Sequence, residues 1–177
     1  MRHEDGWADW MLPVSGLVAA SWAALGMFLA LAVWTDLRWR RVPNVLVAWG
    51  LALALALPLA AVSRPDESLA WPSVGLSVVG TWAAGLTLGG LLLWPLYLRG
   101  AMGAGDIKLM AMAGAFLGPD LAWRAVLYTC VAGGLLALVA IGWQHLRRQG
   151  RPTHQAYAPA VAIGSLVAVA LHGLPLA

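Results

Sequence analysis

The chain has 177 residues, of which 61% are hydrophobic and 11% charged, and its mean hydropathy is +0.76. Soluble domains average roughly 45–50% apolar and about 25% charged residues, so this composition excludes a soluble globular protein. The formal net charge is +3. The eleven basic residues are spread over short loops and form no basic stripe, which indicates membrane topology rather than a nucleic-acid partner. A single cysteine, Cys130, excludes a disulfide framework.

The hydrophobic runs predict an all-α, polytopic membrane protein with about six transmembrane helices. The predicted spans are Val14–Trp34, Val45–Val62, Val74–Leu98, Ile107–Leu117, Leu121–Trp143 and Pro159–Leu176. A spanning helix needs about 20 residues. The fourth span reaches that length only if it continues through Gly118 and its neighbours. A short polar segment over residues 1–13 precedes a single domain over residues 14–177. Its acidic character is unlike that of a secretory signal, so the first run is expected to be a retained helix.

The distribution of charge predicts the orientation of these spans. With the N-terminus outside and six alternating spans, eight of the eleven basic residues lie inside, as the positive-inside rule requires. Without the fourth crossing, the basic cluster over residues 147–151 would move outside and the bias would largely cancel. Both termini are therefore predicted outside. Six of the eight acidic residues also fall outside, and the other two, Asp36 and Asp106, lie at the inner ends of apolar runs.

Glycines at four-residue spacing indicate close contact between helices. Gly85 and Gly89 form one such pair, and Gly114 and Gly118 form another. Small residues at this spacing let two membrane helices approach closely, so both pairs are expected to lie at close helix contacts.

The two inner aspartates are the candidate catalytic groups. Asp36 lies where the first helix leaves the membrane, and Asp106 follows the glycine-rich turn Gly103-Ala104-Gly105. Ionisable residues at membrane depth are costly and usually functional. Two carboxylates brought together resist double ionisation and share one proton. Such a pair can activate water and polarise a peptide carbonyl, which is general acid–base hydrolysis without a metal or covalent intermediate.

Each of these residues also has a purely structural interpretation. Asp36 is placed to form a salt bridge with Arg38, Arg40 or Arg41, and Asp106 is placed to act as a helix N-cap. Lys108 either anchors its helix at the inner interface or compensates the charge of the two carboxylates. Spacing alone does not decide between these interpretations.

Three segments resemble the type IV prepilin peptidases, which are intramembrane aspartic peptidases with a Gly-x-Gly-Asp motif. The segments are TDLRWRRVPN at residues 35–44, GAMGAGDIKLMAMAGAFLG at residues 100–118 and AYAPAVAIG at residues 156–164. They occur in the order found in the family and extend from the end of the first span to the last. Each segment alone is a weak signal, whereas three in order are specific.

The resemblance implies that Asp36 and Asp106 are the catalytic pair, with Gly103, Gly105 and Lys108 as supporting motif positions. It implies an inner-membrane enzyme with a cytoplasmic active site. It also implies a prepilin substrate, a hydrophobic helix with a short basic leader that is cut after a glycine. Long members carry a cysteine-containing insert and also methylate the product. This chain has neither insert nor paired cysteines, so we expect a peptidase alone, like the short forms of tight-adherence (Flp) pilus systems. No cofactor or metal is expected, and the oligomeric state stays open.

Other classes of protein fit the sequence less well. A presenilin-like peptidase would need a Tyr-Asp dipeptide, and a metallopeptidase would need a motif such as His-Glu-x-x-His; neither occurs. Ser165 and His172 lie about 10 Å apart along one predicted helix, which disfavours a serine peptidase. The alternative from another class is a proton-coupled transporter or a pilus assembly factor. A transporter would place its carboxylates near the bilayer midplane, on broken helices in matching halves.

Overall fold

The computed structural model describes residues 8–62, 71–147 and 157–172, and in these ranges it contains five helices. They are α1 (Ala8–Trp39), α2 (Asn44–Val62), α3 (Trp71–Leu98), α4 (Ala104–Arg147) and α5 (Ala158–His172). The predicted all-α class is confirmed. Of the predicted polar segment over residues 1–13, residues 1–7 lie outside the described residues. The remaining residues, 8–13, belong to the beginning of α1.

The predicted fourth and fifth spans both fall within α4, which contains two helical segments that meet at Gly118. Gly118 has φ 69° and ψ 173°, a backbone conformation that is essentially restricted to glycine. Pro119 follows, and a proline disfavours helical geometry in the residue before it. The helix that starts at Ala104 therefore ends at this position, close to the predicted end of the fourth span at Leu117, and does not continue as a regular helix through Gly118.

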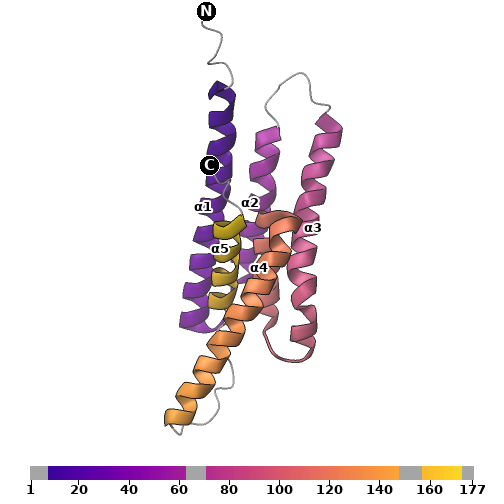
Figure 1. The fold of residues 1–177 in the computed structure, drawn as a ribbon. Helices are drawn as coiled ribbons and strands as arrows, with labels where there is room; N and C mark the ends of the chain where they lie inside the picture. Colours follow the sequence, from indigo (N-terminus) through magenta and orange to yellow (C-terminus); the bar gives the residue numbers. More distant parts are fainter. Residues whose placement is uncertain (1–7, 63–70, 148–156, 173–177) are drawn as a thin grey trace, which may run out of the picture.

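The chain reverses direction at this break. The Thr129 hydroxyl donates a hydrogen bond to the sulfur of Met110 at 3.8 Å, although the two residues are 19 positions apart. In a straight helix they would be about 28 Å apart along the axis. Figure 1 shows the same reversal, with the later part of α4 descending beside its beginning. The segment over residues 104–117 is about 21 Å long, which is shorter than the hydrocarbon core of about 30 Å.

Glycines allow this short segment to pack directly on α3. A Cβ atom added to Gly114 would collide with the backbone oxygen of Gly85. One added to Gly89 would collide with the backbone oxygen of Met110. The two helices are thus antiparallel and touch backbone to backbone, which confirms the packing predicted from the glycine spacing.

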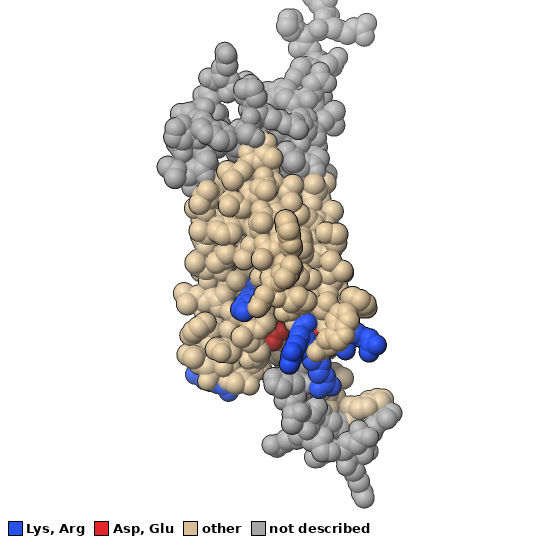
Figure 2. All heavy atoms as spheres, turned by 180° about the vertical axis from the view of Figure 1, so that it is seen from behind, with Lys and Arg blue, Asp and Glu red and all other residues tan. Residues whose placement is uncertain are grey.

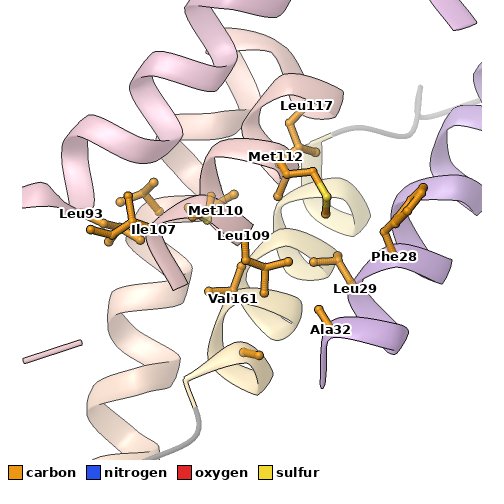
Figure 3. Close-up of a cluster of buried hydrophobic side chains, with 14 of the residues drawn as sticks. Phe28, Leu29, Ala32, Leu93, Ile107, Leu109, Met110, Met112, Leu117 and Val161 are labelled. Atoms are coloured by element: carbon orange, nitrogen blue, oxygen red, sulfur yellow. The ribbon is translucent and has the colours of Figure 1, made fainter. Parts of the chain in front are cut away.

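The short segment forms the centre of the core. Figure 3 shows Leu109, Met110 and Met112 of α4 between Leu93 of α3, Val161 of α5 and Leu29 of α1. All six side chains are at most 1% exposed. Because three other helices surround it, the beginning of α4 is held in a fixed place relative to the ends of α1 and α5.

Three helices are long and apolar enough to cross a membrane, within the ranges that the structure describes. They are Ala19–Trp39, Ser77–Leu98 and Ala104–Trp143, the last counted across its break at Gly118, while Asn44–Ala60 and Ala158–Leu171 are shorter apolar helices. These helices fit a membrane protein. The α1–α2 and α3–α4 connections lie at the same end of the bundle (Figure 1). The basic residues Arg148 and Arg151 of the predicted inner cluster lie outside the described residues.

The α3–α4 connection is set by a left-handed glycine. Gly100 has a φ of 70°. The N–H of Ala101 donates a hydrogen bond to the carbonyl of Leu96, and the N–H of Gly100 donates one to the carbonyl of Tyr97. This is the Schellman pattern that ends many helices. It stops α3 and directs the chain into the turn that precedes Asp106.

Candidate active site

Asp36 lies in the last turns of α1 and is 7% exposed. Its Oδ2 accepts a hydrogen bond of 3.1 Å from the main-chain N–H of Ala158, at the start of α5. Arg40, just beyond the helix, has a left-handed φ of 51°, and its N–H bonds to the carbonyl of Asp36 at 2.7 Å. Helices commonly end through such a residue, and here it turns the chain away immediately after the aspartate.

Asp106 lies in the first turn of α4 and is 8% exposed. Its Oδ2 accepts a hydrogen bond of 3.0 Å from the N–H of Gly103, and the N–H of Asp106 bonds back to the carbonyl of Gly103 at 3.2 Å. This reciprocal pair is half of a capping box, with Gly103 in the cap position and Asp106 three residues later. The structural role considered for Asp106, the N-cap itself, therefore belongs to Gly103.

The two aspartates line one pocket of about 280 Å³, although they come from different helices. We call it the aspartate pocket; its lining residues are Asp36, Arg40, Arg41, Val42, Asn44, Gly103, Gly105, Asp106 and Lys108. Figure 2 shows acidic atoms recessed among basic side chains at one end of a body whose visible surface is otherwise uncharged. The structure thus brings together the five residues that the sequence singled out.

Lys108 contacts a neighbouring helix across the mouth of this pocket. Its ammonium donates a hydrogen bond of 3.0 Å to the side-chain oxygen of Asn44, the first residue of α2. Lys108 is exposed, so it borders the pocket from its outer edge. This contact is compatible with both roles considered for Lys108.

The glycines of the motif keep the backbone close to the carboxylates. A Cβ atom on Gly103 would lie 3.3 Å from Oδ2 of Asp106, the atom to which the Gly103 N–H is bonded. A Cβ atom on Gly105 would lie 3.7 Å from the Cβ of Val42, in the α1–α2 connection. The turn therefore has little spare room on either side.

Tyr157 is a further residue at this site. It precedes α5 and is partly buried, and burial raises the pKa of its phenol, with smaller contributions from Cys130 and from the Asp106 carboxylate. Tyr157 thus interacts electrostatically with Asp106, while the next residue, Ala158, is bonded to Asp36. Sequence reasoning noticed this segment only through its resemblance to known peptidases and assigned no role to Tyr157 or Ala158.

The main-chain donors could not be identified from residue types, because every residue except proline carries the same N–H. Both carboxylates accept such a donor at a helix start, where N–H groups have no partner inside the helix. Charge-assisted hydrogen bonds and the positive end of the helix dipole both stabilise an ionised carboxylate. The site therefore holds two buried acids in a setting suited to acid–base chemistry.

Comparison with known proteins agrees with this geometry. A family model described as the type IV leader peptidase family matches residues 23–138, which include both aspartates. No solved structure shows a significant match to the chain.

Three curated relatives, each named prepilin leader peptidase/N-methyltransferase, illustrate the similarity. The protein of Pectobacterium carotovorum is 28% identical over 151 residues, covering 72% of this chain and 53% of the relative. That of Dickeya chrysanthemi is 32% identical over 156 residues, covering 84% and 49%. That of Burkholderia pseudomallei is 34% identical over 128 residues, covering 60% and 41%. The chain spans about half the length of the curated relatives that it matches. With the family match extending over more than half of its residues, the chain belongs to the type IV leader peptidase family.

Proposed function

We propose that this protein is a membrane-embedded aspartic endopeptidase that removes the leader peptide of type IV prepilins. The observation that carries the proposal is the aspartate pocket, which both Asp36 and Asp106 line although they lie on different helices. Membership of the leader peptidase family and the names of the curated relatives support the substrate class.

In this proposal the two carboxylates share one proton and hydrolyse the peptide bond by acid–base chemistry. The ionised carboxylate removes a proton from water as the water oxygen attacks the carbonyl carbon. The protonated carboxylate donates its proton to the carbonyl oxygen, which gives a tetrahedral diol. The diol then collapses, the amide nitrogen takes up a proton, and the carbon–nitrogen bond breaks. The oxygen and both hydrogens of water are then distributed between the two products.

The basic side chains around the pocket have an electrostatic role in this scheme. Arg40, Arg41 and Lys108 line the same space as the two acids. Opposite charges within a few ångströms favour the ionised form of a carboxylate. They reduce the cost of keeping an ionised carboxylate in a largely buried site.

The finer features of the substrate and the reaction are also part of the proposal. We propose a Flp-type prepilin with a short basic leader, cut after a glycine at the cytoplasmic face of the inner membrane. The residues to which the proposal assigns a role act in hydrolysis, and none of them is assigned a role in methyl transfer. We therefore expect the released N-terminus of the pilin to be unmethylated.

A proton-coupled transporter, the alternative from another class, accounts for one feature only. The break at Gly118 gives the broken helix that such a protein would have. However, Asp36 lies near the end of α1 and Asp106 in the first turn of α4, next to the α1–α2 and α3–α4 connections at one end of the bundle (Figure 1). Both carboxylates accept hydrogen bonds from N–H groups at the start of a helix, Gly103 before α4 and Ala158 in α5. This placement at helix ends supports a reaction site near the membrane surface.

The proposal is tested by co-expressing the protein with a Flp-type prepilin and measuring the mass of the pilin. Wild type is expected to release the leader after glycine, while Asp36→Asn and Asp106→Asn each lower the rate by at least about a hundredfold, since acid–base groups contribute 10²–10⁴-fold. Asp120→Asn is the matched control, because Asp120 is exposed and does not line the pocket. Normal insertion of wild type without cleavage of any prepilin would contradict the proposal and favour the transporter or assembly factor.

A further inference from the structure

We propose that Tyr157 and Gly133 form a positioning contact that presents the main-chain N–H of Ala158 to Asp36. This inference rests on the proposed function and deepens it, because it assigns a role to the start of the last helix. It concerns residues that touch neither water nor the scissile bond in the mechanism above, so they are positioning residues.

The N–H of Ala158 is available to Asp36 because of its place in α5. Ala158 is the first residue of the helix, and the first N–H groups of a helix have no carbonyl partner within it. The carboxylate of Asp36 provides that partner at 3.1 Å, and both residues are buried. The bond joins residues 122 positions apart, so its geometry depends on where α5 starts relative to α1.

Tyr157 determines that starting point. Its carbonyl accepts the N–H groups of Ala160 at 2.9 Å and Val161 at 3.2 Å, which makes Tyr157 the cap residue of α5. Its phenol ring packs directly on Gly133, in the descending part of α4. A Cβ atom on Gly133 would collide with the hydroxyl and lie within 2.7 Å of two ring carbons. The ring therefore fits only because residue 133 has no side chain.

The neighbouring glycine provides a natural comparison. Gly134 is exposed, and a Cβ atom placed on it meets no atom within 4 Å. A second close contact anchors α5 one and a half turns further on, where a Cβ atom on Gly164 would collide with Thr129. With this second contact in place, altering residue 133 is expected to move the start of α5 more than its body.

The expected effect is on the orientation of Asp36 and on the pH dependence of the aspartate pair as a whole. Asp106 and Lys108 from α4 and Arg40 and Arg41 just after α1 line the pocket together with Asp36, and the Tyr157 phenol interacts electrostatically with Asp106. All of these remain in a variant that removes only the Ala158 donor. A hydrogen bond to a charged group stabilises the charged form more than a hydrogen bond between neutral groups would. Loss of the Ala158 donor is therefore expected to move the acid limb of the pH–rate profile to higher pH by roughly one unit.

The first experiment removes the hydrogen bond itself. Ala158→Pro deletes the N–H at a helix position where proline is well tolerated, and Ala158→Gly keeps the N–H. With the co-expressed prepilin, kcat of Ala158→Pro is expected to be about tenfold below that of Ala158→Gly, with KM unchanged and the acid limb at higher pH. Identical kcat values and pH profiles in the two variants would overturn the inference.

The second experiment tests the positioning contact and does not depend on the folding of the proline variant. Gly133→Ala is expected to lower kcat and shift the acid limb in the same direction, while Gly134→Ala leaves both near wild type. Tyr157→Ala should lower kcat as Gly133→Ala does, whereas Tyr157→Phe should keep most of the wild-type kcat. The double variant Gly133→Ala/Tyr157→Ala should have the same kcat as Tyr157→Ala alone, because both changes remove the same contact. Equal behaviour of Gly133→Ala and Gly134→Ala, or full additivity with Tyr157→Ala, would reject the contact.

These outcomes are separable from a failure of the proposed function. If wild type cleaves no prepilin, the peptidase proposal fails before these variants are compared. If wild type cleaves and Asp36→Asn does not, while the Ala158 and Gly133 pairs are indistinguishable, only the positioning role is rejected.

Discussion

Asp36 and Ala158 are joined by a hydrogen bond between a side-chain carboxylate and a main-chain N–H, at 3.1 Å and 122 positions apart. The bond connects the end of α1 to the start of α5. Asp106, at the start of α4, lines the same pocket. Three helix ends therefore meet at one site, and each of them contributes a group whose place depends on the other two.

The first prediction concerns the interdependence of the two acids. If Asp36 and Asp106 act as one unit, the double variant Asp36→Asn/Asp106→Asn should cleave prepilin no more slowly than either single variant. Residues that act as a unit are strongly non-additive in catalysis. Rates from purified variants in detergent test this, with membrane insertion confirmed for each. Multiplicative losses would indicate that the two acids act separately.

The second prediction concerns pH. One protonated and one ionised carboxylate are required at the same time, so the cleavage rate should rise and then fall as pH increases. The two apparent transitions belong to the pair and not to either residue. The measurement is kcat/KM against pH with a synthetic prepilin peptide. A profile that is flat across the acid range, with chemistry rate-limiting, would contradict a shared proton.

The third prediction concerns the contact between Lys108 and Asn44, which joins α4 to α2 at the edge of the aspartate pocket. Lys108→Met and Asn44→Ala should each lower kcat/KM by roughly two- to tenfold, the range expected for one hydrogen bond. The double variant should lose little more than the worse single variant, because both remove the same contact. Independent, additive effects would show that the two side chains act through different partners.

The fourth prediction concerns the reversal at Gly118. Gly118→Ala places a side chain at φ 69°, with the new Cβ 3.3 Å from a methyl group of Thr81. This backbone strain should cost about 1–3 kcal/mol and lower the midpoint of thermal unfolding in detergent. Gly142→Ala, on the same helix with no atom within 4 Å of the new Cβ, is the control and should be neutral or slightly stabilising. A midpoint for Gly118→Ala equal to that of the control would mean that the break does not need glycine.

The fifth prediction concerns metals. Hydrolysis by two carboxylates requires no Lewis acid, so cleavage of prepilin should be unchanged after incubation with a chelator such as EDTA. The assay compares rates before and after chelation, and after adding back Mg²⁺ or Zn²⁺. Loss of activity that metal restores would assign the carboxylates to a metal site.

Several features were predictable from the sequence because local information determines them. The apolar runs predicted the ends of α2 and α3 to within three residues, since hydrophobicity and helix length are properties of a continuous segment. The two aspartates were identified by their position at the ends of apolar runs and by a glycine-rich turn. The spacing of Gly85 and Gly89 correctly indicated a close helix contact.

Other features depend on contacts between distant residues and were not predictable in this way. The break at Gly118 coincides with the predicted gap between Leu117 and Leu121, but the place of the short segment at the centre of the core depends on its contacts with α1, α3 and α5. The role of Ala158 depends on its main-chain N–H, which no residue type reveals. The sequence by itself determined an apolar helical protein with two candidate acids. Only the tertiary structure decided that these acids share a pocket, and only it identified the N–H group of α5 that donates a hydrogen bond to Asp36. Such contacts form between segments that are far apart in the chain.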